Sequence, residues 1–318
     1  RRIGGDLTLD GELRQGGGLL NLIGGGTVGS TGRLDVSNSE LKLGSALSFA
    51  GTLVVDNGTS WSGLGGTVDL SAGTLESSGG TLSLDKFITG ANTAFRLSGN
   101  TEVTNSDNMT FGTLDLGGNR LTLGEGILGL TLPNTLTMDN ASSAIETKNA
   151  NLTLEQALSL TVGSITSTAG TLTLSQGGTL GGSGFLDVRG STLKLSDNLS
   201  VGSGTLNTRN YFHPDYDSVL HLLDDVTLTF LNGGANFKAL EHNGNTLTLG
   251  GTTGMLLLTE RLTLNARTLH TQGNDLYLVR GITLDNNSLL DSTGGTLTLR
   301  GTVDNSSELN VPGTVLKV

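Results

Sequence analysis

A short phrase of one apolar, one polar and one apolar residue recurs along the whole chain, often as Leu-Thr-Leu. It occurs at 7–9, 121–123, 152–154, 172–174, 247–249, 262–264 and 297–299. Strict alternation is the period of a β-strand, whose successive side chains point to opposite faces. Each phrase is flanked by Gly, Asn, Asp or Ser, which favour turns. The phrase therefore predicts many short strands, with Leu turned inward and Thr turned outward.

The phrases are separated by two nested steps. Leu172 to Leu193 spans 21 residues, and Leu228 to Leu247 and Leu297 to Leu316 each span 19, while shorter steps of seven occur at 34–41 and 114–121. A step near seven nested three times inside a step near twenty predicts a three-sided parallel β-helix, or β-solenoid. At about 20 residues per coil, the 318 residues make roughly 15 or 16 coils.

We expect one all-β solenoid domain over residues 1–318. The stretch 218–226 has apolar residues at helical spacing, although strand alternation fits it almost as well. The repeat is less regular near 86–112, 139–150 and 208–218. The last of these contains Pro214 and three of the few aromatic residues, so it predicts a loop insertion that leaves a corner. The candidate contact residues of this lateral loop are Arg209, Tyr211, Phe212, His213, Asp215, Tyr216 and Asp217.

Charge and cysteine content exclude several classes of function. The formal net charge is −11, whereas a nucleic-acid-binding surface or an anionic-membrane surface requires a basic face. The absence of Cys excludes disulfides and thiolate metal sites. The longest apolar run, at 255–258, is far shorter than a membrane helix. We therefore expect neither a nucleic-acid partner nor membrane insertion.

Two glycine-rich strings approach known ligand motifs. Residues 24–29 match the dinucleotide pattern G-x-G-x-x-G, but a turn and a strand pattern follow at 30–36 in place of the required helix. Residues 181–187 nearly match a calcium nonapeptide, with Asp187 one residue late and no second copy. We expect no cofactor, and calcium bound at acidic corners is the alternative that the sequence leaves open.

Phrases at 117–124, 243–250 and 294–299 resemble the repeats of large bacterial surface exoproteins. These proteins include autotransporter passenger domains and filamentous-haemagglutinin-like adhesins. The resemblance covers most of the chain as a repeat texture. It implies a right-handed β-helix, export, an extracellular place at the bacterial cell surface, and adhesive or structural work there.

The terminal residues predict complementary edges. The strand pattern is already present at 7–9 and is still present at 315–318, and no helix-period segment covers either edge. Such edges stack on the edges of other copies, head to tail, or on the rest of a longer solenoid chain. The candidate end-to-end contact residues are Leu7, Leu9, Val315, Leu316 and Val318.

The function that these features predict is a non-enzymatic, extracellular structural solenoid that self-assembles into a filament or a surface layer. Two alternatives stay open. One is an adhesin segment that binds a glycan or a host surface through lateral loops. The other is a carbohydrate-active β-helix enzyme, for which paired carboxylates would be needed. The acidic and histidine residues of 209–225 have no spacing that assigns a catalytic pair.

Overall fold

The computed structural model contains strands, turns and bends and no helix in the residues that it describes. These are residues 1–318 except 63–64, 105–106, 125, 189–190, 198, 202–204, 208–218, 223–224, 231–232, 243, 252–253, 266 and 286. The chain separates into two compact units, Arg1–Leu152 and Thr153–Val318. The expectation of a single domain stays a prediction, and the units are described separately.

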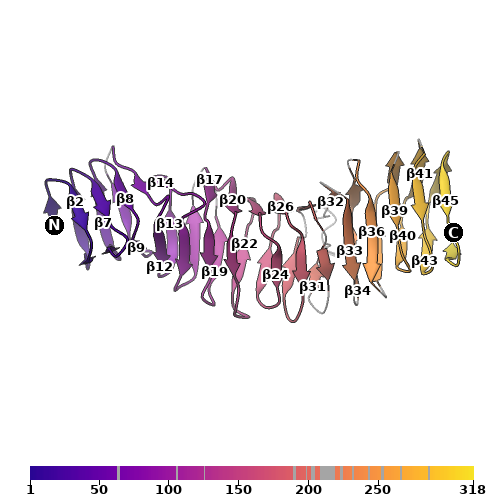
Figure 1. The fold of residues 1–318 in the computed structure, drawn as a ribbon, viewed down its shortest axis with the longest axis horizontal. Helices are drawn as coiled ribbons and strands as arrows, with labels where there is room; N and C mark the ends of the chain where they lie inside the picture. The colour runs from indigo at the N-terminus through magenta and orange to yellow at the C-terminus, as the bar shows by residue number, and fades with distance from the viewer. Residues whose placement is uncertain are drawn as a thin grey trace. The chain divides into compact units, whose positions relative to one another are not determined.

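Three faces make up the first unit, and each face takes every third strand of the chain (Figure 1). One sheet contains β1 (Arg2–Ile3), β4 (Gly18–Leu22), β7 (Ser39–Leu43) and β10 (Ser60–Ser62). The second contains β2 (Leu7–Leu9), β5 (Gly26–Val28), β8 (Leu47–Phe49), β11 (Val68–Asp69) and β14 (Phe87–Ile88). The third contains β3 (Glu12–Arg14), β6 (Arg33–Asp35), β9 (Thr52–Val55), β12 (Thr74–Ser77), β15 (Ala94–Leu97), β18 (Thr113–Asp115) and β21 (Thr135–Thr137).

Two further strand series complete the first unit. The strands β13 (Gly80–Ser83), β16 (Thr101–Thr104), β19 (Arg120–Leu123) and β22 (Ala144–Glu146) pair in this order. The strands β17 (Asn108–Thr110) and β20 (Gly129–Leu132) pair with each other. A further strand, β23 (Asn151–Leu154), lies at the boundary of the two units.

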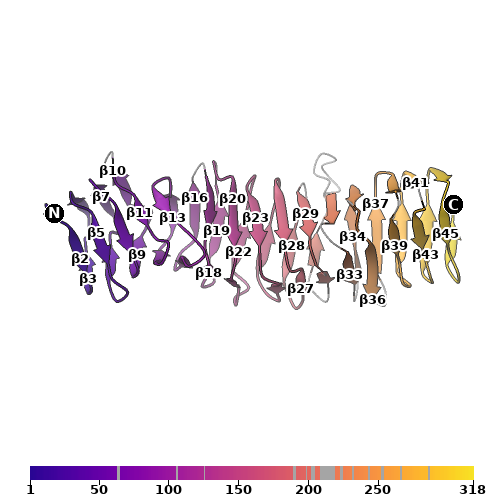
Figure 2. The same ribbon diagram turned by 45° about the horizontal axis from the view of Figure 1, so that its top comes forward.

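The second unit repeats the same plan (Figure 2). Its longest sheet contains β24 (Leu158–Leu160), β27 (Gly178–Leu180), β30 (Leu199–Val201), β33 (Val226–Phe230), β36 (Leu247–Gly251), β39 (Thr268–His270), β42 (Leu289–Asp291) and β45 (Glu308–Asn310). Two series precede the last turns: β25 (Ser164–Thr166), β28 (Phe185–Asp187) and β31 (Thr205–Asn207), and β26 (Thr171–Leu174), β29 (Thr192–Leu195), β32 (Val219–Leu222) and β35 (Ala239–Glu241). Two sheets follow them: β34 (Gly233–Phe237), β37 (Gly254–Leu258), β40 (Asp275–Leu278), β43 (Thr296–Leu299) and β46 (Val315–Lys317), and β38 (Leu262–Asn265), β41 (Gly281–Asp285) and β44 (Thr302–Asn305).

Because neighbours in a sheet are three strands apart in the chain, each turn contributes one strand to each of three faces. The parallel sheets form a β-solenoid of about 13 turns, roughly 21 residues apart, which confirms the expected fold. The number of turns expected from the sequence, 15 or 16, is higher than the observed number of about 13. The sheets are interrupted at several places, and some steps are longer than twenty residues, as between Leu193 and Leu220, which are 27 residues apart.

The interior of both units is built from columns of inward Leu residues. Leu247, Leu249, Leu262 and Leu264 are each at most 1% exposed, as the alternation predicts. Their outward partner Thr263 is exposed. Hydrophobic burial of these stacked side chains is the main stabilising term of such a fold. The stretch 218–226 contributes strands rather than a helix in its described part.

One predicted pairing is wrong by two residues. The sequence spacing suggested Leu228 beside Leu247, but Leu228 pairs with Leu249, and Leu247 pairs with Val226. A slip of two residues keeps every side chain on the same face of its strand, so alternation alone does not distinguish the two registers. The pairings of Leu172 with Leu193 and of Leu297 with Leu316 are as expected.

Candidate functional site

The predicted lateral loop lies outside the described residues. This holds for all of its candidate contacts, Arg209, Tyr211, Phe212, His213, Asp215, Tyr216 and Asp217. The pairings on either side still show where the repeat changes length. Leu172 pairs with Leu193 after 21 residues, whereas Leu193 pairs with Leu220 after 27.

The first turn of the first unit presents one edge to solvent. Its strands β1, β2 and β3 are each the last strand of their sheets. The candidate contacts Leu7 and Leu9 lie on β2 and are half-buried. Leu9 pairs with Val28 of the next turn, which is only 1% exposed. The edge therefore uncovers residues that occupy core positions.

The last turn of the second unit presents the opposite kind of edge. Its strands β44, β45 and β46 end their sheets. The candidate contacts Val315, Leu316 and Val318 are 56%, 46% and 90% exposed. Val303 on β44 is 39% exposed as well. We call the last strands β44, β45 and β46, with these exposed apolar residues, the terminal edge.

Register shows that the terminal edge continues the core columns of the second unit. Leu316 pairs with Leu297, which is fully buried, and Val303 pairs with Ile282, which is also fully buried. Among the described strands, none pairs with the outer side of β44, β45 or β46, so these residues lack the cover that the buried ones have. Unpaired backbone groups of an edge strand and an uncovered core column both favour the addition of another strand layer.

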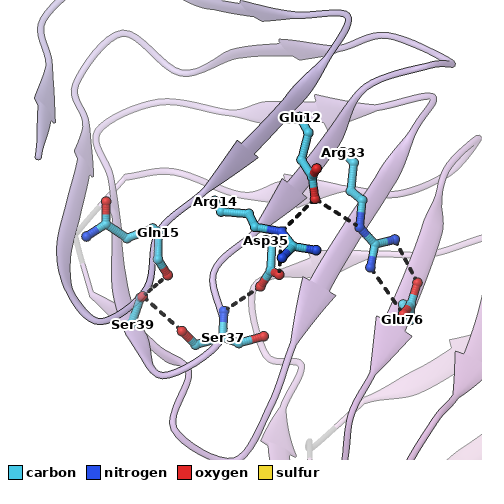
Figure 3. A network of polar contacts seen from close by, with 8 residues as sticks. All are labelled: Glu12, Arg14, Gln15, Arg33, Asp35, Ser37, Ser39 and Glu76. Atoms are coloured by element: carbon cyan, nitrogen blue, oxygen red, sulfur yellow. Dashed lines mark hydrogen bonds and ion pairs between the residues drawn. The ribbon is translucent and has the colours of Figure 1, made fainter.

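Charged side chains cover part of the third sheet of the first unit (Figure 3). Arg33 on β6 donates two hydrogen bonds to Glu76 on β12, at 2.9 and 3.2 Å. Glu12 approaches the Nε atoms of Arg14 and Arg33, at 2.7 and 3.8 Å. Asp35 lies 3.7 Å from the Arg14 Nε. These carboxylates are engaged by cations, so the cluster stabilises turns rather than offering a free acid–base pair.

This network also changes the protonation equilibrium of Arg33. The hydrogen bonds to Glu76 raise the pKa of the guanidinium, and partial burial opposes them. The negative charges of Glu76, Asp35 and Glu12 act in the same direction as the hydrogen bonds. Arg33 therefore remains charged in any physiological medium.

A second surface, around the single tryptophan Trp61, was not predicted from the sequence. Its ring meets that of Phe87 edge to face, with centroids 4.9 Å apart and planes at 85°. Trp61 also lines an opening of about 70 Å³ together with Asp85 and Lys86. The irregular spacing over 86–112 and the presence of one tryptophan in an aromatic-poor chain are the signals that could have indicated it.

Two histidines in the second unit pair with carboxylates. His221 Nδ1 lies 2.9 Å from Glu241, and His270 Nδ1 lies 3.0 Å from Asp291. Within the part of the chain that the structure describes, no three His, Asp or Glu side chains are arranged to hold a metal ion. None of the described segments is a helix that could cross a membrane.

Comparisons of the chain with protein-family models, with curated proteins and with solved structures found no match. The resemblance to bacterial surface exoproteins therefore stays a prediction from the repeat texture.

Proposed function

We propose that the protein is a non-enzymatic structural β-solenoid whose turns continue by head-to-tail stacking on copies of itself, in a filament or a layer outside the cell. The observation that carries the proposal is the terminal edge. Leu316 and Val303 are exposed although each continues a column of fully buried residues. Another turn laid on this edge would bury both residues and pair the backbone groups of the last strands.

The opposite edge has the chemistry to supply such a turn. Leu7 and Leu9 on β2 occupy core positions and are half-buried. Stacking the edge with β1, β2 and β3 on the terminal edge would join two different surfaces. A contact of this heterologous kind repeats without closing and produces open polymers.

The test compares the association of two lysine variants. Leu316→Lys places a charge in the terminal edge, which blocks strand addition. Thr263→Lys places the same charge on an exposed outward position of β38. Light scattering should show a mass that rises with concentration for the unmodified chain and for Thr263→Lys, and a mass near 32.6 kDa for Leu316→Lys.

Two results would contradict the proposal. One is that the unmodified chain remains a monomer at high concentration, and the other is that both lysine variants associate equally. Mass spectrometry of the native polypeptide separates stacking from covalent continuation. A chain near 32.6 kDa supports assembly from copies, and a much longer solenoid chain replaces the second copy by further turns of the same chain.

One observation favours lateral contacts as a second function. The step from Leu193 to Leu220 is six residues longer than the step from Leu172 to Leu193, and the predicted loop 208–218 falls within it. An insertion at this place would present its side chains beside the stack and suits an adhesin segment. Deletion of the six residues 210–215, which restores the 21-residue step, should then abolish surface adhesion while leaving assembly unchanged.

A further inference from the structure

Two of the three faces of the first unit are interrupted at neighbouring levels. β10 and β14 end their sheets, and β13 and β17 begin the next series, whereas the third sheet continues from β9 through β12 and β15 to β18. At each interruption, a side-chain oxygen accepts a hydrogen bond from a backbone N–H group. Asn57 Oδ1 accepts a hydrogen bond from the Thr81 N–H at 3.1 Å, and Thr89 Oγ1 accepts one from the Thr110 N–H at 3.3 Å.

Two openings flank β14 at these interruptions. One, of about 70 Å³, is lined by Trp61, Asp85 and Lys86 above buried Leu41 and Leu43. The other, of about 240 Å³, is lined by Asp85, Phe87, Ile88, Asp107 and Asn108. Asp85 lines both openings, so they adjoin at this residue, and we call the pair of openings the β14 groove. Its residues all lie within the first unit.

Aromatic and apolar surface is accessible in the β14 groove. Trp61 and Phe87 are partly exposed and hold each other in an edge-to-face contact. Ile88 beside them is 48% exposed. Aromatic residues make up 4% of the chain, so an accessible pair at a sheet interruption is unusual here. Rigid aromatic faces of this kind bind flat, weakly polar surfaces with little loss of side-chain entropy.

The rim of the groove is polar and mostly acidic. Asp85, Asp107 and Asn108 are exposed, and among the described residues Lys86 is the only cation lining either opening. Carboxylate and amide oxygens accept hydrogen bonds from hydroxyl groups. With a protein charge of −11, this rim disfavours an anionic ligand.

A contact beside β14 disfavours an added peptide strand between β14 and β17. A strand inserted there would need two inter-strand distances of about 4.8 Å each. The direct hydrogen bond between the Thr110 N–H and Thr89 Oγ1 shows that the two segments are already in contact. A ligand would therefore lie over the groove rather than extend the sheet.

We propose that the β14 groove binds a neutral oligosaccharide. The apolar face of a sugar ring would lie against one of the two aromatic rings, Trp61 or Phe87, because their planes stand at 85° to each other. Hydroxyl groups of the oligosaccharide would donate to Asp85 and Asp107. This site is independent of the terminal edge, so its failure would leave the proposed assembly untouched. It also lies apart in sequence from the predicted lateral loop.

The single tryptophan makes a direct assay available. The intrinsic fluorescence of Trp61 is followed while maltotriose, cellotriose or triacetylchitotriose is added, with trigalacturonate as the anionic comparison. We expect a saturable change in emission for at least one neutral trisaccharide and none for trigalacturonate. No change with any neutral sugar would overturn the proposal, and so would preferred binding of trigalacturonate.

Two matched variants locate the binding. Asp107→Asn removes a charged acceptor from the groove, and Asp115→Asn makes the same change on β18, outside both openings. We expect Asp107→Asn to weaken sugar binding by about tenfold, the usual effect of losing one hydrogen bond to a charged group. Asp115→Asn should leave binding unchanged. Equal effects of the two changes, at equal melting temperatures, would place the sugar elsewhere and contradict the proposal.

Discussion

Arg33 on β6 and Glu76 on β12 form a two-pronged ion pair across the strand between them, β9. The residue of β9 that pairs directly with Glu76 is Val54, an outward residue that is only 5% exposed. The ion pair thus joins two turns that are not hydrogen-bonded to each other. Arg261 repeats this arrangement in the second unit, where it bonds to Asp304 at 2.6 Å, 43 residues along the chain.

The first prediction concerns this ion pair. Glu76→Gln keeps the shape of the side chain and removes its charge. We expect a loss of about 0.5–1 kcal/mol in the free energy of unfolding, because the pair is partly exposed to solvent. A double-mutant cycle with Arg33→Gln, measured by urea unfolding, isolates the coupling.

The pH dependence of this pair has a definite sign on the arginine side. Because the folded pKa of Arg33 is raised, its contribution to stability is complete below the ordinary pKa of arginine and is lost only as the pH rises through the folded value. Arg14→Gln is the control for Arg33→Gln, because the Arg14 side chain is 68% exposed to solvent. A coupling energy of zero between Arg33 and Glu76 would contradict the account.

The second prediction tests inward and outward positions on one strand. Leu264 and Thr263 are neighbours on β38, with Leu264 only 1% exposed and Thr263 exposed. Leu264→Ala should reduce the free energy of unfolding by about 2–5 kcal/mol, since it leaves a cavity in the core. Thr263→Ala should change it by about 0.5 kcal/mol or less. Similar losses for both variants, measured by thermal unfolding, would mean that the register of β38 is wrong.

The third prediction separates backbone strain from a close approach. Gly18 and Gly25 both have positive φ angles, 74° and 78°. A Cβ atom at Gly18 would meet nothing within 4 Å, whereas at Gly25 it would meet the carbonyl oxygen of Ala46 on the next turn. Gly18→Ala should therefore cost about 1 kcal/mol of stability and Gly25→Ala about 2–4 kcal/mol. Equal melting temperatures of the two variants would show that the turns are not packed as described.

The sequence predicted the repeating parts of the fold because alternation and spacing act locally. Leu172, Leu193 and Leu297 have the pairing partners that their spacing suggested. Register was less certain, since Leu228 pairs two residues away from the predicted partner. Either register keeps Leu228 inward, and the difference depends on turn length, which an alternating pattern does not encode.

Contacts that skip a turn could not be predicted in this way. Arg33 and Glu76 are 43 residues apart, and only the path of β9 between them brings their side chains together. The groove beside Trp61 depends on two interruptions of the sheets, and a residue pattern shows only that the repeat there is irregular. The sequence also predicts end-to-end contacts at Val315 and Leu316 on β46, and these stay a prediction.

The central claim is that the edge of β1, β2 and β3 stacks on the terminal edge of another copy. Since the chain has no Cys, introduced cysteines report this contact alone. Thr8→Cys is combined in turn with Asp304→Cys, Asn310→Cys or Lys317→Cys, one on each last strand. A short bifunctional maleimide is then added to the concentrated protein. We predict a ladder of dimers, trimers and longer products for at least one double variant, with no products from the single variants. Absence of a ladder from all three double variants, or dimers from a single variant, would contradict head-to-tail stacking.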